Sequence, residues 1–139
     1  MSESMQALQA FIDEWTDTEE KTKAAFVRLK AHLETKEGVI LDFIPRAGVT
    51  YSLRAAHENQ KTRSLFAMVD VIEDQPRWLS VCFYGEMIKD PDEQGDYVPE
   101  GLLGEDAVCF DVEVFDEEQL TYVESRLDEA HASGARGGD

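Results

Sequence analysis

Apolar residues recur at helical spacing in the first quarter of the chain, up to Gly38. One stripe within residues 4–16 consists of Met5, Leu8, Phe11, Ile12 and Trp15. This spacing predicts a short amphipathic helix. A second helix is predicted between residues 16 and 38, where Phe26, Leu29 and Leu33 continue one face. Thr16 with Glu19, or Asp17 with Glu20, has the spacing of a capping box at its start.

After Gly38 the apolar period changes from helical to two, which is the spacing of a half-buried strand. The alternation is clearest in VTYSLRAA, where Tyr51 and Leu53 share one face and Arg54 lies on the other. Five strands are predicted, within residues 39–44, 49–56, 63–72, 77–86 and 106–115. Helical spacing returns in residues 116–133, with Asp116 as the N-cap.

Strands that lie together between helices, with short connections, are typical of an α+β fold. We therefore predict two helices, four strands, a long loop, a fifth strand and a final helix. The sheet should be largely antiparallel, with the helices packed on one face. The chain of 139 residues fits one domain. We place this domain at residues 1–133 and expect residues 134–139 to be a flexible tail.

The strand predicted at residues 63–72 is apolar on both faces, so its second face needs a cover. The residues expected on that second face are Phe66, Met68, Ile72, Trp78, Cys82 and Tyr84. A large apolar patch is rarely left to water on a soluble monomer. Either the first helix, with Trp15, wraps around to cover it, or a second copy of the protein packs there.

The same face also carries residue types that concentrate binding energy at protein interfaces, namely Trp, Tyr and Arg. If their strands are neighbours, the candidate binding surface consists of Ser52, Arg54, Arg63, Trp78 and Tyr84. The alternative is that helices cover this face, which would make Trp78 and Tyr84 ordinary core residues.

Four segments carry a resemblance to known proteins: GVTYSLRAA, RSLFAMVDV, RWLSVCFYGE and the terminal VEVFDEEQLTYVESRLDEAHA. In the order of its elements, the chain from about residue 45 to 132 resembles the small bacterial "double-wing" proteins of the YjbR type and neighbouring families. The resemblance implies a compact α+β domain of a kind sometimes compared with DNA-binding folds. It implies no established reaction, and no functional residue can be carried over.

The charge of the chain argues against a nucleic-acid partner. The formal net charge is −17, and residues 78–139 contribute three basic and seventeen acidic residues to it. Such a chain is repelled by nucleic-acid phosphates and by anionic membrane surfaces. We expect no nucleic-acid partner and no membrane partner.

The two cysteines, Cys82 and Cys109, lie in predicted strands and have no CxxC spacing. We expect both to be reduced, half-buried residues. The N-terminal residues lack a basic region followed by an apolar segment, so no secretory signal is expected there. A cytoplasmic location is predicted.

The acidic segment at residues 89–106 has part of the pattern of a calcium-binding loop. Asp90, Asp92 and Gln94 occupy the first, third and fifth positions of such a loop, but Gly101 stands where a bidentate Glu is required. We therefore interpret the segment as a solvated excursion between strands and expect no metal site, Asp90, Asp92 and Gln94 being only a weak candidate.

No catalytic motif and no phosphate-binding loop occurs in the sequence. We expect no cofactor and no catalytic residue. The hypothesis with most support is a non-enzymatic protein-interaction or regulatory module that binds a protein partner or itself as a homodimer. The alternative is a small-molecule-binding domain or an enzyme with a pocket between the helices and the sheet.

Overall fold

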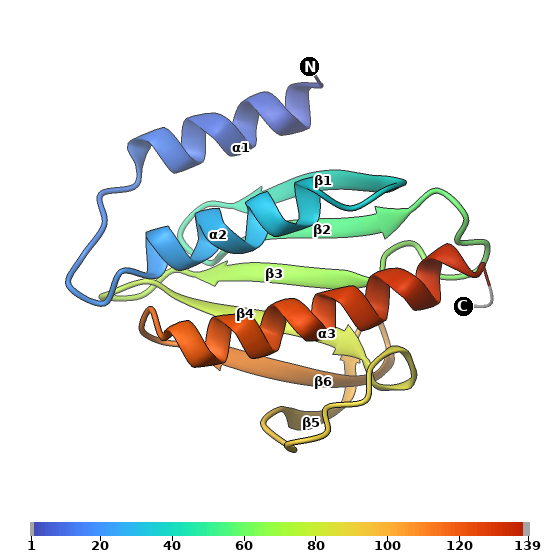
Figure 1. The fold of residues 1–139 in the computed structure, drawn as a ribbon. Coiled ribbons are helices and arrows are strands. Elements are labelled where there is room, and N and C mark those ends of the chain that lie inside the picture. The colour runs from blue at the N-terminus through green and yellow to red at the C-terminus, as the bar shows by residue number, and fades with distance from the viewer. Residues whose placement is uncertain (1, 138–139) are drawn as a thin grey trace.

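The computed structural model describes residues 2–137, which form an α+β fold with three α-helices and a six-stranded antiparallel sheet (Figure 1). The elements in chain order are α1 (Glu3–Glu14), α2 (Thr22–Glu34), β1 (Val39–Arg46), β2 (Thr50–His57), β3 (Ala67–Ile72), β4 (Trp78–Tyr84), the short 3₁₀ helix η1 (Gly85–Met87), β5 (Asp96–Leu102), β6 (Glu105–Val112) and α3 (Glu117–Ala135). The strand order across the sheet is β1-β2-β3-β4-β6-β5. The predicted α+β class is confirmed.

The prediction of five strands is wrong, because the expected loop at residues 89–106 contains the additional strand β5. Pro99 and Gly101 interrupt its alternation, and its register with β6 shifts between Val98 and Leu102. Proline is tolerated in an edge strand because no partner needs its missing N–H. Only Leu102 of β5 is buried, so the strand carries little of the apolar signal that reveals the others.

The helices lie on one face of the sheet, as predicted, with α2 and α3 across its middle and α1 along the β1 edge (Figure 1). Ser4 of α1 accepts a hydrogen bond from the backbone N–H of Phe43 at 2.6 Å, which satisfies a donor on the edge strand. The core fills the space between the two layers. Phe26 of α2, Leu127 of α3 and Val81 of β4 are all fully buried there.

The helix starts follow the sequence signals only in part. Asp116 caps α3 as predicted, because its carboxylate accepts hydrogen bonds from the N–H groups of Glu118 and Gln119. The capping boxes expected at residues 16–20 do not open α2, which begins at Thr22. Asp17 instead reaches the helix from the preceding loop and accepts from the N–H groups of Lys23 and Ala24.

The last helix continues past the expected stop at Ser133–Gly134 and ends at Ala135. Gly134 is buried in its last turn, and a Cβ atom there would lie 3.3 Å from Cβ of His57. The glycine therefore allows close packing on the end of β2 instead of ending the helix. The tail predicted at residues 134–139 thus overlaps α3, and residues 138–139 lie outside the described residues.

One expectation about the second sheet face is wrong, and one of the two alternatives for its cover is excluded. Phe66 precedes β3 and turns toward the helices: it is fully buried, and its ring centroid lies 5.8 Å from that of His131 on α3. Trp15 also packs on the helix side, 5.8 Å from the ring of Phe26. The first helix therefore does not wrap around the sheet.

Candidate protein-interaction face

The face of the sheet opposite the helices is called the open face, because no helix of residues 2–137 lies over it (Figure 1). Strand register places its side chains in rows that cross neighbouring strands. One row contains Arg46, Thr50, Ile72 and Trp78. The next contains Ile44, Ser52, Asp70, Ser80 and Asp111. The third contains Asp42, Arg54, Met68, Cys82, Cys109 and Asp96.

Apolar side chains on the open face retain partial contact with water. Met68, Ile72 and Trp78 are half-buried by their neighbours in the sheet, whereas the alternating residues Val69 and Val71 on the helix side are fully buried. Half-buried apolar side chains on a face without a second layer are the kind of surface that binds another molecule.

Charge is unevenly distributed across the open face. Arg46 and Arg54 lie on β1 and β2, where they donate hydrogen bonds to the hydroxyl groups of Thr50 and Ser52. Within the described part of the chain, no carboxylate lies within 4.0 Å of either guanidinium group. Asp42 on β1 lies opposite Arg54 in the register, whereas the other side of the face carries Asp111 and Asp96 and, within the described residues of β5 and β6, no basic side chain. Burial raises the pKa of Asp111 on β6, and the negative charges of Asp96 and Glu113 raise it further.

Asp70 lies in the middle of the open face, between Ser52 on β2 and Ser80 on β4. Its Oδ1 atom is buried and has no hydrogen-bond partner among the described residues. Desolvation raises the pKa of Asp70, although a hydrogen bond from Ser52 and the positive charge of Arg54 oppose the change. An ionised carboxylate with a buried, unpaired oxygen destabilises the fold.

Replacing Asp70 with Asn should therefore increase stability at pH 7 by about 1 kcal/mol. The folded-state pKa lies above the ordinary value of 3.8, so the native state holds the proton more tightly than the unfolded state does. The stability that this proton contributes is present below pH 3.8 and is lost as the pH rises through the folded-state pKa. Urea unfolding at pH 3.5 and pH 7, with dilute protein, measures the difference between the two proteins, which should be much smaller at pH 3.5. A variant less stable than wild type at pH 7 would contradict this account.

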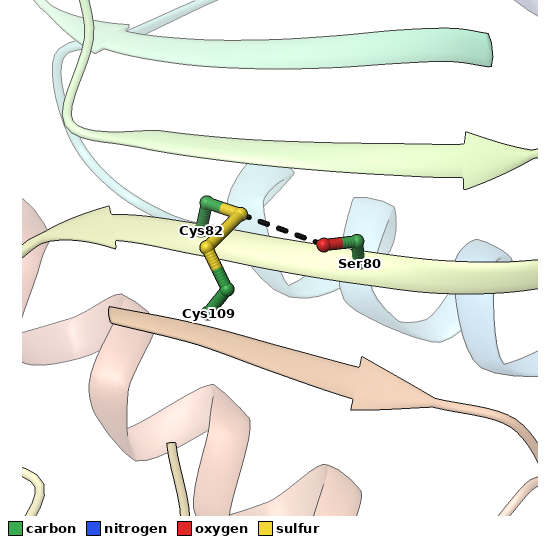
Figure 2. Close-up of a disulfide and its surroundings, with 3 residues drawn as sticks. All are labelled: Ser80, Cys82 and Cys109. Carbon is green, nitrogen blue, oxygen red and sulfur yellow. Dashed lines mark hydrogen bonds between the residues drawn. A yellow bond between two sulfur atoms is a disulfide. The ribbon is translucent and has the colours of Figure 1, made fainter. Parts of the chain in front are cut away.

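Cys82 and Cys109 form a disulfide, so the prediction of two reduced cysteines is wrong (Figure 2). They lie directly opposite each other on β4 and β6, with their Cα atoms 4.1 Å apart. The hydroxyl oxygen of Ser80 lies 3.5 Å from Sγ of Cys82. The sequence could not reveal this pairing, because it depends on β4 and β6 being neighbours although β5 separates them in the chain.

Four residues of the candidate binding surface lie on the open face, but they do not form one cluster. Ser52 and Arg54 are close together near its centre. Trp78 and Tyr84 lie at opposite ends of β4. The indole N–H of Trp78 donates a hydrogen bond to Asp74 at 3.3 Å, and Tyr84 is only 2% exposed.

Arg63, the fifth candidate, precedes β3 and covers the end of β4. Its guanidinium carbon lies 4.5 Å from the centroid of the Tyr84 ring, and its nitrogens form ion pairs with Glu105 at 2.8 Å and Glu86 at 3.2 Å. These residues line a surface hollow of about 460 Å³, which also includes Tyr97. The Glu105 carboxylate raises the pKa of Arg63 more than burial lowers it, so the guanidinium stays charged.

The weak calcium candidates have structural contacts that hold the loop in place. Burial alone would raise the pKa of Asp90, but hydrogen bonds from the Tyr122 hydroxyl and from the N–H groups of Gly95 and Gln94 lower it below the ordinary value. The side chain of Gln94 and that of Asp92 are exposed. Among residues 2–137 no group of three or more His, Cys, Asp or Glu side chains is arranged to hold a metal ion.

Sequence reasoning missed three features of the open face: the Asp70 carboxylate with one unsatisfied oxygen, the disulfide, and the opposition between the arginines and Asp111. Asp70 had a signal, since it is the only charged residue in the apolar segment 65–72. The other two features required the strand order.

The fold and this face define the class of the protein as an α+β sandwich in which residues 2–137 leave one face of the sheet uncovered (Figure 1). Comparison of the chain with family models, with curated proteins and with solved structures finds no match. The resemblance to the double-wing proteins stays a prediction. Within residues 2–137 no helix has both the length and the apolar character needed to cross a membrane.

Proposed function

We propose that the protein is a non-enzymatic interaction module that pairs with a second copy of itself through the open face. The observation that carries this proposal is the set of half-buried apolar side chains, including Met68 and Ile72 on β3, on a face that no helix of residues 2–137 covers (Figure 1). Burying such a surface removes apolar area from water, which is the main driving force of most protein association.

The charge pattern favours a second copy as the occupant. In the sheet order β1-β2-β3-β4-β6-β5, a two-fold axis along the strands between β3 and β4 places β2 of one copy over β6 of the other. This orientation places Ser52 over Asp111 of the other copy. The guanidinium of Arg54 lies one row away and donates a hydrogen bond to Ser52, so it approaches Asp111 diagonally, and the symmetry repeats the contact on the other side. A chain with a net charge of −17 repels its own copy in most orientations, and this orientation brings Arg54 near Asp111. The same orientation places Asp42 on β1 over Asp96 on β5, so the arginine contacts also offset one repulsive pair on each side.

The size of the open face suits such a pair. Six strands of six to eight residues give a face of roughly 600 Å² in projection, from standard strand spacing. A standard-sized interface buries about 800 Å² of accessible surface on each partner, which a side-chain-covered face of this projection can supply. Two sheets that pack face to face also align their strands within about 30°.

The alternative of a ligand pocket between the helices and the sheet has less support. Fully buried side chains, among them Leu29, Leu53 and Leu120, fill that space. The 460 Å³ hollow lies at the end of β4, and its guanidinium group is already neutralised by Glu105 and Glu86. The other candidate for the open face is a different protein that presents the same charges as a second copy would. The experiments treat its binding as the second outcome.

Paired charge reversals test the proposal. Arg54→Glu and Asp111→Arg should each weaken self-association by about tenfold or more, because each homodimer would then face like charges. An equimolar mixture of the two variants should restore pairing, because both symmetry-related contacts of the mixed dimer are again attractive. Native mass spectrometry identifies the mixed dimer directly, since the variants differ in mass.

The matched control is a mixture of Arg54→Glu with Lys89→Glu, because Lys89 is exposed and lies outside the open face. Lys89→Glu alone should pair like wild type, and its mixture with Arg54→Glu should not enrich the mixed dimer over homodimers of Lys89→Glu. Random pairing of Arg54→Glu with Asp111→Arg would make the mixed dimer as abundant as the two single-variant dimers together. That result would show that these residues do not face each other.

A further inference from the structure

We propose that Cys82 and Cys109 form a reversible thiol–disulfide site, and that its oxidation state controls pairing through the open face. The second part of this inference rests on the proposed function, whereas the first part does not. The disulfide lies in the row with Met68 and Arg54, near the middle of the face.

The disulfide joins two strands that the fold already holds together. β4 and β6 are paired from Leu79 opposite Val112 to Tyr84 opposite Ala107, so the backbone ladder continues on both sides of the two cysteines. On the helix side Val81 is fully buried in the core. Reduction therefore removes a cross-link but leaves the hydrogen bonds and apolar packing that position these strands.

Small thiols approach the site from the open face. The two cysteines are buried, at 7% and 8% exposed, but their side chains lie on the face that no helix of residues 2–137 covers (Figure 1), so only side chains of the open face separate them from water in the monomer. The Ser80 hydroxyl, 3.5 Å from Sγ of Cys82, can donate a hydrogen bond to a thiolate at that position. This contact favours Cys82 as the leaving thiolate and Cys109 as the sulfur that is attacked.

The exchange is balanced with a monothiol such as glutathione as the reductant. Its thiolate attacks Sγ of Cys109, the Cys82–Cys109 bond breaks, and Cys82 leaves as a thiolate that takes a proton. A second glutathione thiolate attacks the glutathione sulfur of the mixed disulfide and releases Cys109, which is protonated in turn. Two glutathione molecules thus become one glutathione disulfide, and two electrons and two protons reduce the cysteine pair.

Reduction changes the surface at the centre of the open face. Two bonded sulfur atoms lie closer together than two thiols in van der Waals contact, so reduction moves the side chains of Cys82 and Cys109 apart. An interface packed as densely as a protein interior tolerates such a change poorly. We expect the reduced protein to pair with a dissociation constant about tenfold higher than that of the disulfide form.

Two measurements on the full-length chain test the two parts. Equilibration in glutathione buffers of different ratio, followed by alkylation and mass spectrometry, should show the pair passing between disulfide and dithiol, with unchanged circular dichroism. Persistence of the disulfide in millimolar reduced glutathione, or unfolding upon reduction, would show a structural cross-link and overturn the reversible site. The double variant Cys82→Ala/Cys109→Ala should keep the fold. It should pair more weakly than the disulfide form of the wild type, and to the same extent whether glutathione is added or omitted.

Sedimentation of the oxidised and reduced wild type tests the control of pairing. A dissociation constant about tenfold higher after reduction supports the inference. Equal pairing in both states would overturn the redox control and leave the proposed function in place. Absence of pairing in both states would overturn the proposed function together with its redox control, and the alkylation experiment would still decide whether the site is reversible.

Discussion

Replacing Met68 with Glu is expected to dissociate the dimer without unfolding the protein. Met68 lies on the central strand β3, half-buried on the open face, between Arg54 on β2 and Cys82 on β4. Pairing would bury the new carboxylate beside Asp70, which lies two residues away on the same face. The new carboxylate also lies opposite Arg54, so it competes with Asp111 of the second copy for that guanidinium. Desolvating the charge and losing the contact with Asp111 together cost about 2–5 kcal/mol, which weakens pairing about 30-fold or more.

Size-exclusion chromatography with light scattering measures this change, and circular dichroism shows whether the fold is retained. The matched control is Val27→Glu, because Val27 on α2 is a large apolar residue that is 40% exposed on the helix side. The control should retain the mass of the wild-type protein. A Met68→Glu protein that still has the dimer mass would place the contact elsewhere.

Replacing Phe66 with Ala is expected to have the opposite effect, a large loss of stability with no specific effect on pairing. Phe66 is fully buried against α3, whereas Met68, two residues later, lies on the open face. Removing a buried phenyl ring leaves a cavity and costs about 3–5 kcal/mol. Urea unfolding followed by circular dichroism measures the loss, and a change below about 1 kcal/mol would show that the ring is not part of the core.

These two positions also show how far the sequence predicts the fold. Alternation over residues 65–72 correctly places Met68 and Ile72 opposite Val69 and Val71. The same rule fails for Phe66, because β3 begins only at Ala67 and the preceding backbone does not follow the strand period. Periodicity identifies a face only inside the strand, and the strand boundary is set by packing between distant segments.

The sequence predicts which side of the sheet the candidate residues share. It does not predict how these residues are arranged on that side. Trp78 and Arg54 are correctly assigned to the second face, yet nothing in their spacing shows that they lie in different rows. The pairing of Cys82 with Cys109 depends on β6 lying between β4 and β5. Strand β5 itself carried too little apolar signal to be seen, so the information that fixes this order is spread over the whole fold.

Sedimentation equilibrium of the oxidised wild-type protein at micromolar concentration is the most direct test of the central claim, that the open face pairs with a second copy. The chain has a mass of 15.7 kDa, and we predict a species of twice that mass that dissociates upon dilution. A single species of 15.7 kDa over the whole concentration range would contradict self-association through the open face.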